Sequence, residues 1–191
     1  GGITDGSGQT VTITGPGQIN PNYFSSGSTA NRGAIQSITG NNTWAGNITL
    51  AGASGTVSGN TRIGVQNGSS LTITGNITEA VEGMSPFFRA GSSPSDHITL
   101  VGTGSWTGVT RIYGDGGAGL KLAGNNRLPT LPALLVGTSG NSVVGDPSFD
   151  LAGFNQAVAS LSDGGVSSGT VTNTNTLRIL TLNGLSDTTF S

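Results

Sequence analysis

The chain of 191 residues has no cysteine and a single histidine, His97. Without cysteine it can form neither a disulfide scaffold nor a thiol nucleophile. With one imidazole, a metal cluster built from several histidines is excluded, and a Ser-His-Asp triad would have to use His97. We interpret His97 as an outward strand residue and predict no metal site and no cofactor.

Charged residues are also scarce, with 7 Lys and Arg against 9 Asp and Glu and a formal net charge of −2. Nucleic acids and anionic membranes are bound by several cations gathered on one face, and the sequence has no basic cluster. The apolar runs are only a few residues long, far short of the roughly 20 residues that span a bilayer. We therefore predict no nucleic-acid partner and no membrane insertion by this segment.

Small residues that favour turns and strands make up about half of the chain. Gly, Thr, Ser and Asn account for 99 of the 191 residues, whereas helix formers are few, with one Lys and two Glu. The apolar fraction of 33%, counted together with the 34 glycines, is in the range of globular domains. The composition predicts one all-β domain over residues 1–191, since no linker divides the chain.

A short apolar or alternating segment closed by glycine recurs along the chain. The copies are TVTITG (10–15), NITLAG (47–52), LTITG (71–75), HITLVG (97–102), LKLAG (120–124), ALLVG (133–137), FDLAG (149–153) and LTLNG (180–184). Their irregular spacing is typical of a solenoid, and we predict a right-handed single-stranded parallel β-helix with coils of roughly 20 to 25 residues. Corners would use Asn41-Asn42, Asn67-Gly68 and Asn125-Asn126, because Gly and Asn tolerate positive φ.

Residues 149–165 have two interpretations. Phe154, Val158 and Leu161 have the spacing of one face of a helix, but the same stretch also fits the period of two that a strand requires. Because the rest of the chain favours strands, we predict that Ala157, Ala159 and Leu161 point inward. Gln156, Val158 and Ser160 would then point outward.

The second half of the chain resembles a known family. SWTGVTRIYGDGGAGLKLAGNNRLP (105–129), LLVG (134–137), FDLAGFNQAVASLS (149–162) and GTVTNTN (169–175) are similar in order and approximate spacing to the autotransporter-associated β-strand repeat, or passenger-associated transport repeat. The resemblance implies an extracellular or surface-displayed bacterial β-helix that serves as a stalk, adhesin or fibre segment. It implies no catalytic residue. Residues 16–40 and 79–95 match poorly, and we predict insertions near 20–33 and 79–96.

The two ends of the chain read as parts of one coil. DTTFS closes the sequence and GGITDGSGQTVTITG opens it, and in relatives of this type a similar segment runs unbroken between repeats. Either a longer protein was cut there, or the chain is one unit of a tandem array or filament. An uncapped solenoid exposes unpaired strand edges, so we expect head-to-tail pairing with further copies. The predicted stacking residues are Ile3, Val11, Ile13, Leu180, Leu182 and Phe190.

The insertions and the glycosylation sequons are candidate surface features. The insertions hold Tyr23, Phe24, Phe87, Phe88 and Arg89, which would either form an interaction surface or fold down over the core. Four N-x-S/T sequons, at Asn41, Asn47, Asn67 and Asn76, are candidate sites of glycan attachment. Surface glycans are the second candidate partner after the chain itself.

A carbohydrate-binding or carbohydrate-cleaving β-helix is the alternative function. Cleavage needs acidic residues that converge, yet among the aspartates only Asp146 and Asp150 are close in sequence, and Asp5, Asp115 and Asp163 each precede a glycine as in turns. GDGGAGLKL (114–122) also lacks the aspartate of a calcium nonapeptide. We therefore expect no enzyme activity. The alternative would be favoured if Trp44, Trp106 and Tyr113 lined one exposed groove.

Overall fold

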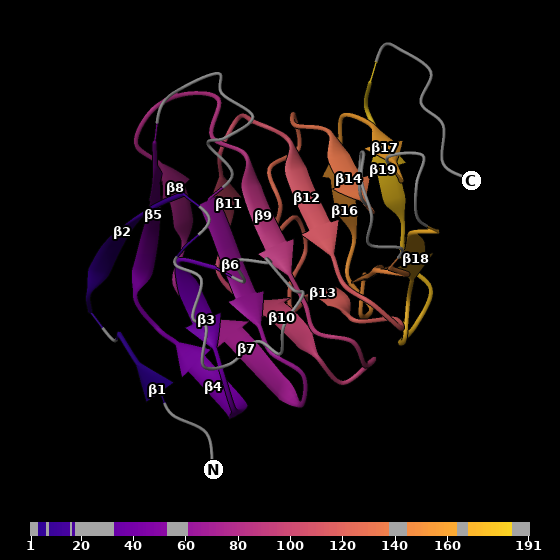
Figure 1. Cartoon of the computed structure of the whole chain (residues 1–191). Helices are drawn as coiled ribbons and strands as arrows, with labels where there is room; N and C mark the ends of the chain where they lie inside the picture. The colour runs from indigo at the N-terminus through magenta and orange to yellow at the C-terminus, as the bar shows by residue number, and fades with distance from the viewer. Residues whose placement is uncertain are drawn as a thin grey trace.

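The computed structural model shows an all-β solenoid. It describes residues 4–6, 8–15, 17, 33–52, 61–137, 145–163 and 168–184. Over these ranges there is no helix, and all of the paired strands run parallel. Figure 1 shows the strands of successive coils side by side, from β1 at one end to β18 and β19 at the other. The predicted parallel β-helix is confirmed.

Three sides of the solenoid are built from four sheets. Sheet A contains β1 (Thr4–Asp5), β4 (Gly40–Trp44), β7 (Ser69–Ile73), β10 (His97–Leu100), β13 (Gly119–Leu122), β15 (Ser148–Asp150) and β18 (Thr170–Thr172). Sheet B contains β2 (Thr10–Thr14), β5 (Asn47–Ala51), β8 (Ile77–Glu79) and β11 (Gly104–Ser105). Sheet C contains β3 (Ile35–Ser37), β6 (Thr61–Val65), β9 (Pro86–Arg89), β12 (Thr110–Tyr113), β14 (Leu134–Val136) and β17 (Leu161–Ser162). Sheet D pairs β16 (Gln156–Val158) with β19 (Leu180–Leu182).

The irregular spacing of the glycine-closed segments follows from this topology. Those segments lie on different sides: 71–75 and 97–102 belong to sheet A, 10–15 and 47–52 to sheet B, and 133–137 to sheet C. Two segments that follow each other in the sequence therefore lie either on the same side of successive coils or on different sides of the solenoid. Within one sheet, one strand follows another after each full coil.

The core consists of apolar ladders inside the coils. In sheet A, Leu71, Ile98, Leu120 and Phe149 are partners in register across four strands, and each is at most 4% exposed. Burial of a large apolar side chain contributes about 1.5 to 3 kcal/mol. Because each rung lies on the rung of the next coil, the ladder ties neighbouring coils together.

The inward and outward assignment was wrong for residues 156–158, whereas Leu161 points inward as predicted. Gln156 and Val158 are each 1% exposed, whereas Ala157 and Ala159 are half-buried. A corner at 159–160 interrupts the alternation, so Val158 and Leu161 both point inward from two different strands. Gln156 is tolerated inside because its amide exchanges two hydrogen bonds of 3.0 Å with the backbone of Leu128.

Two further sequence predictions need correction. Residues 79–96 are not an insertion, because they include the core strand β9, in which Phe88 is 1% exposed. Asn41-Asn42 lies within β4 and forms no corner. The corners at Asn67-Gly68 and Asn125-Asn126 are confirmed, with φ of +76° at Gly68 and +50° at Asn126. The other predicted insertion, 20–33, lies outside the described residues except for residue 33.

Candidate functional site

The C-terminal end of the solenoid exposes positions that are buried elsewhere. Leu180 and Leu182 in β19 pair with Gln156 and Val158 in β16, both of which point into the core. Leu182 is nevertheless 50% exposed, because β19 is the last strand of its sheet in the described part of the chain. The predicted stacking residues Leu180 and Leu182 thus lie on the terminal coil.

Two more apolar side chains belong to the same terminal coil. Leu177 is 92% exposed and Ile179 is 65% exposed, between β18 and β19. The sequence analysis missed both, because neither lies in a glycine-closed segment. Together with Leu182 they form what we call the leucine end: Leu177, Ile179 and Leu182. Three large apolar side chains exposed on one terminal coil are more than the isolated exposed leucines that protein surfaces commonly carry.

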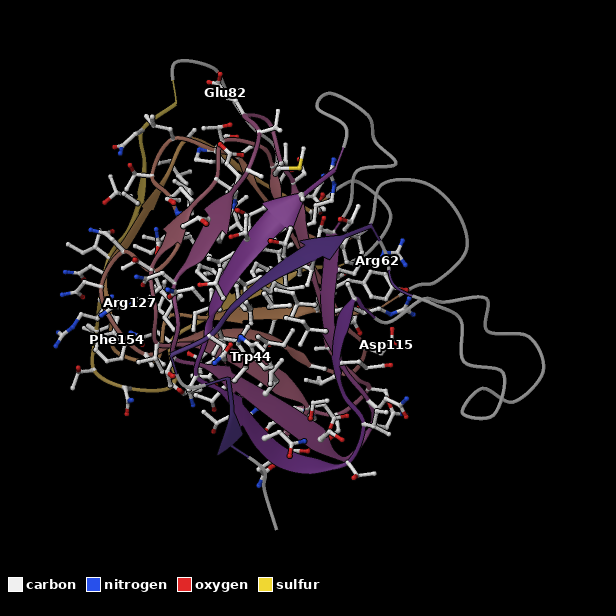
Figure 2. All side chains as sticks on the ribbon, turned by 90° about the vertical axis from the view of Figure 1, so that its left-hand side faces the viewer. Trp44, Arg62, Glu82, Asp115, Arg127 and Phe154 are labelled. Carbon is white, nitrogen blue, oxygen red and sulfur yellow. The ribbon has the colours of Figure 1, made fainter. Side chains whose placement is uncertain are left out.

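The N-terminal end is hollow where the leucine end protrudes. A cavity of about 290 Å³ opens beside β3 and β4, and its apolar lining includes Ile35, Ile38, Trp44 and Leu71. Figure 2 looks onto this end and shows Trp44 toward the middle of the coil cross-section. We call this cavity the N-terminal hollow.

Two buried polar atoms accompany the N-terminal hollow. The indole Nε1 of Trp44 and the amide Nε2 of Gln36 are buried without a hydrogen-bond partner, and both residues line the cavity. An unpaired buried donor destabilises a protein by about 1 to 3 kcal/mol. These two donors therefore lower the stability of this end locally.

The predicted stacking residues at the N-terminal end lie in β2. Ile13 is 5% exposed and Val11 is partly buried, and they pair in register with Leu50 and Ile48 of β5. Their side chains therefore pack in the core of the first coil and are not exposed for stacking. Ile3 and Phe190 lie outside the described residues.

The predicted interaction loop is part of sheet C. Phe88 is in the core, while Phe87 and Arg89 lie on the outer side of β9. The guanidinium of Arg62 sits 4.8 Å from the Phe87 ring centre and that of Arg89 sits 5.0 Å from the Tyr113 ring centre. Desolvation by burial lowers the pKa of Arg62, and it does the same to the pKa of Arg111. Tyr23 and Phe24 lie outside the described residues.

Three of the four sequon asparagines take part in ladders between coils. Asn41 Oδ1 accepts the Ser70 hydroxyl at 2.9 Å, and Asn47 Oδ1 accepts the Asn76 backbone N–H at 3.0 Å. Asn76 Oδ1 in turn accepts the backbone N–H of Thr103 at 3.0 Å. Asn67 differs, since it is an exposed turn residue.

Among the acidic residues, Asp150 is held by structural hydrogen bonds. Asp150 accepts the backbone N–H groups of Ala152 and Thr174 and the Thr174 hydroxyl at 2.8 to 3.1 Å, and lies 3.7 Å from the Lys121 ammonium. Across the described ranges, no group of three His, Cys, Asp or Glu residues could hold a metal ion. The glycine-rich segment 114–122 forms a corner, with φ of +55° at Gly116 and +85° at Gly117, and then enters strand β13 at Gly119.

The aromatic residues named for the carbohydrate alternative do not share a groove. Trp106 is 1% exposed, packs 6.0 Å from Phe88 and donates from Nε1 to the Thr110 hydroxyl at 2.8 Å. Tyr113 is 5% exposed, and Trp44 lies at the N-terminal hollow. A carbohydrate site built on these three rings is excluded.

No known protein family, curated protein or solved structure matches the chain. In the part of the chain that the structure describes, there is no helix long and apolar enough to cross a membrane.

Proposed function

We propose that the chain is an extracellular structural or adhesive β-helix segment of a bacterial surface, and that it extends by end-to-end addition of coils from further copies or flanking repeats. The observation that carries the proposal is the exposure of Leu182 at a position that is buried one coil earlier, at Val158. A further coil placed on β19 would bury Leu182 as β19 buries Val158.

The two ends complement each other. The leucine end presents apolar side chains, and the N-terminal hollow is an apolar recess with two unpaired donors. Parallel strands at both ends leave edges that can continue the same ladders, as in β-strand addition. A contact between unlike ends repeats without closing, which gives a fibre. The resemblance to passenger repeats supports an extracellular location and an adhesive or structural role.

The test uses variants that block one end each. Leu182→Lys places a charge on the leucine end, and Thr39→Arg places one at the mouth of the N-terminal hollow, where Thr39 is exposed. We expect the unsubstituted chain to form fibres at high concentration, visible by electron microscopy, and each variant alone to stay monomeric. A mixture of the two variants should form dimers, which sedimentation velocity detects. The unsubstituted leucine end of Thr39→Arg can then bind the unsubstituted N-terminal hollow of Leu182→Lys.

The matched control is Leu131→Lys, because Leu131 is 83% exposed in the middle of the solenoid. This variant should assemble like the unsubstituted chain. A chain that remains monomeric at high concentration, or a control that blocks assembly as well as Leu182→Lys does, would contradict the proposal.

A further inference from the structure

The outer side of sheet A carries a groove, separate from both ends, whose mostly apolar lining is interrupted by polar side chains. It has a volume of about 420 Å³ and lies across the coils of β10, β13, β15 and β18. This size is in the range of pockets that hold small ligands. Its polar lining includes His97, Lys121, Asp146, Ser148, Asp150 and Thr170.

The register places three of the groove residues side by side. On β13 the residue between His97 of β10 and Ser148 of β15 is Gly119, and all three share one outward column. Gly119 is required by packing, because a Cβ there would lie 1.8 Å from the Ser148 carbonyl oxygen. The groove passes over Gly119, with His97 on the β10 side and Ser148 and Asp146 on the β15 side.

The groups around this groove define the ligand chemistry. Hydroxyls and the exposed Asp146 carboxylate offer acceptors, while Lys121 and the hydroxyls offer donors. Two carboxylates stand against one ammonium, which disfavours an acidic ligand. Asp150 is held by Thr174 and Ala152, which favours binding over acid-base chemistry at that residue. Sugar hydroxyls both donate and accept hydrogen bonds, so they can pair with the donors and with the acceptors that line the groove.

The length of the groove sets the size of the ligand. Four neighbouring strands at about 4.8 Å spacing span roughly 14 Å, which suits a short oligosaccharide. We propose that this groove, defined by His97, Lys121, Asp146, Ser148, Asp150 and Thr170, binds a neutral glycan chain. This binding is a second activity, independent of end-to-end stacking.

Binding is tested by calorimetry with neutral oligosaccharides of glucose, galactose, mannose or N-acetylglucosamine, and with acidic oligosaccharides of the same length. Both the unsubstituted chain and Leu182→Lys should bind at least one neutral series. Asp146→Ala removes an exposed acceptor and should weaken affinity at least tenfold. Thr170→Arg should abolish binding, because Thr170 is exposed and the longer side chain fills the groove.

The matched control is Glu82→Ala, which removes an exposed carboxylate. Figure 2 shows Glu82 and Asp115 on different sides of the solenoid, and Asp115 precedes Gly116, which lines the groove. Glu82→Ala should bind as the unsubstituted chain does. Absence of binding to every neutral series, unchanged affinity in Asp146→Ala and Thr170→Arg, or equal affinity for acidic oligosaccharides would overturn the proposal. Fibre formation plays no part in this readout, so either proposal can fail alone.

Discussion

At the residue scale, buried polar side chains hold the corners where the ladders stop. Asp96 is fully buried, and its carboxylate accepts backbone N–H groups from Gly68, Ser92 and Ser93 at 2.9 to 3.1 Å. Gly68 belongs to the turn of the preceding coil, so one carboxylate joins two coils. Gln156 does the same with Leu128. At these positions, Asp96 and Gln156 connect neighbouring coils through hydrogen bonds to backbone N–H groups that would otherwise be unpaired.

We predict that Asp96→Ala lowers the free energy of unfolding by about 2 to 4 kcal/mol, because three backbone N–H groups lose their fully buried acceptor. Asp96→Asn should be milder, since one amide oxygen still accepts. Urea denaturation followed by circular dichroism measures the change. Glu82→Ala, which removes an exposed carboxylate, should stay within about 0.5 kcal/mol of the unsubstituted chain. Equal stability of Asp96→Ala and Glu82→Ala would show that the buried carboxylate is dispensable.

At the element scale, the glycines that close strands are explained by contact between coils. A Cβ on Gly75 would lie 1.9 Å from the carbonyl oxygen of Gly46, and a Cβ on Gly102 would lie 2.0 Å from that of Gly75. Each coil therefore turns the same corner directly against the backbone of the coil before it. Gly68 is different, since its φ is +76° but nothing lies within 4 Å of an added Cβ.

This difference predicts unequal effects of two alanine substitutions. Gly102→Ala forces a backbone shift between two coils, and we expect a loss of more than about 3 kcal/mol in stability, as with other severe steric changes. Gly68→Ala meets only the penalty of a left-handed conformation, about 1 to 2 kcal/mol. Thermal denaturation of both variants measures the comparison. A Gly102→Ala variant no less stable than Gly68→Ala would refute the proposed corner contact.

The sequence predicted these strands better than it predicted the direction of their side chains. Glycine-closed alternating segments identified most strands of sheet A, because period two and the closing glycine are both local signals. The burial of Gln156 was missed, since its partner Leu128 lies one coil away. β9 was taken for an insertion because PFFR has no alternation of polar and apolar residues. The groove on sheet A depends on the register between coils, and no local pattern shows it.

At the scale of the whole molecule, each coil contacts mainly the coils before and after it. Sheet A runs without interruption through seven strands, and the described core residues form one continuous cluster. Stability in such an array is approximately a sum of coil terms and nearest-neighbour terms. Inner coils have two neighbours, whereas the coil of β18 and β19 has one among the described residues.

Amide hydrogen exchange should therefore follow position along the solenoid. We expect the slowest exchange in β7, β10 and β13, and exchange at least tenfold faster in β18 and β19, because terminal coils open without disturbing the rest. Mass spectrometry of exchanged peptides measures the gradient on Leu182→Lys, which keeps the chain monomeric under the stacking proposal. Uniform protection across all coils would instead indicate all-or-none opening.

The parallel ladders also set how the molecule would respond to tension. Hydrogen bonds between coils run roughly along the solenoid axis, across the strands they join. A pull on the two ends would load the interface between one pair of coils at a time, beginning with the weakest. The segment would then lengthen stepwise, one loop of chain after another, and act as an extensible tether rather than a brittle rod.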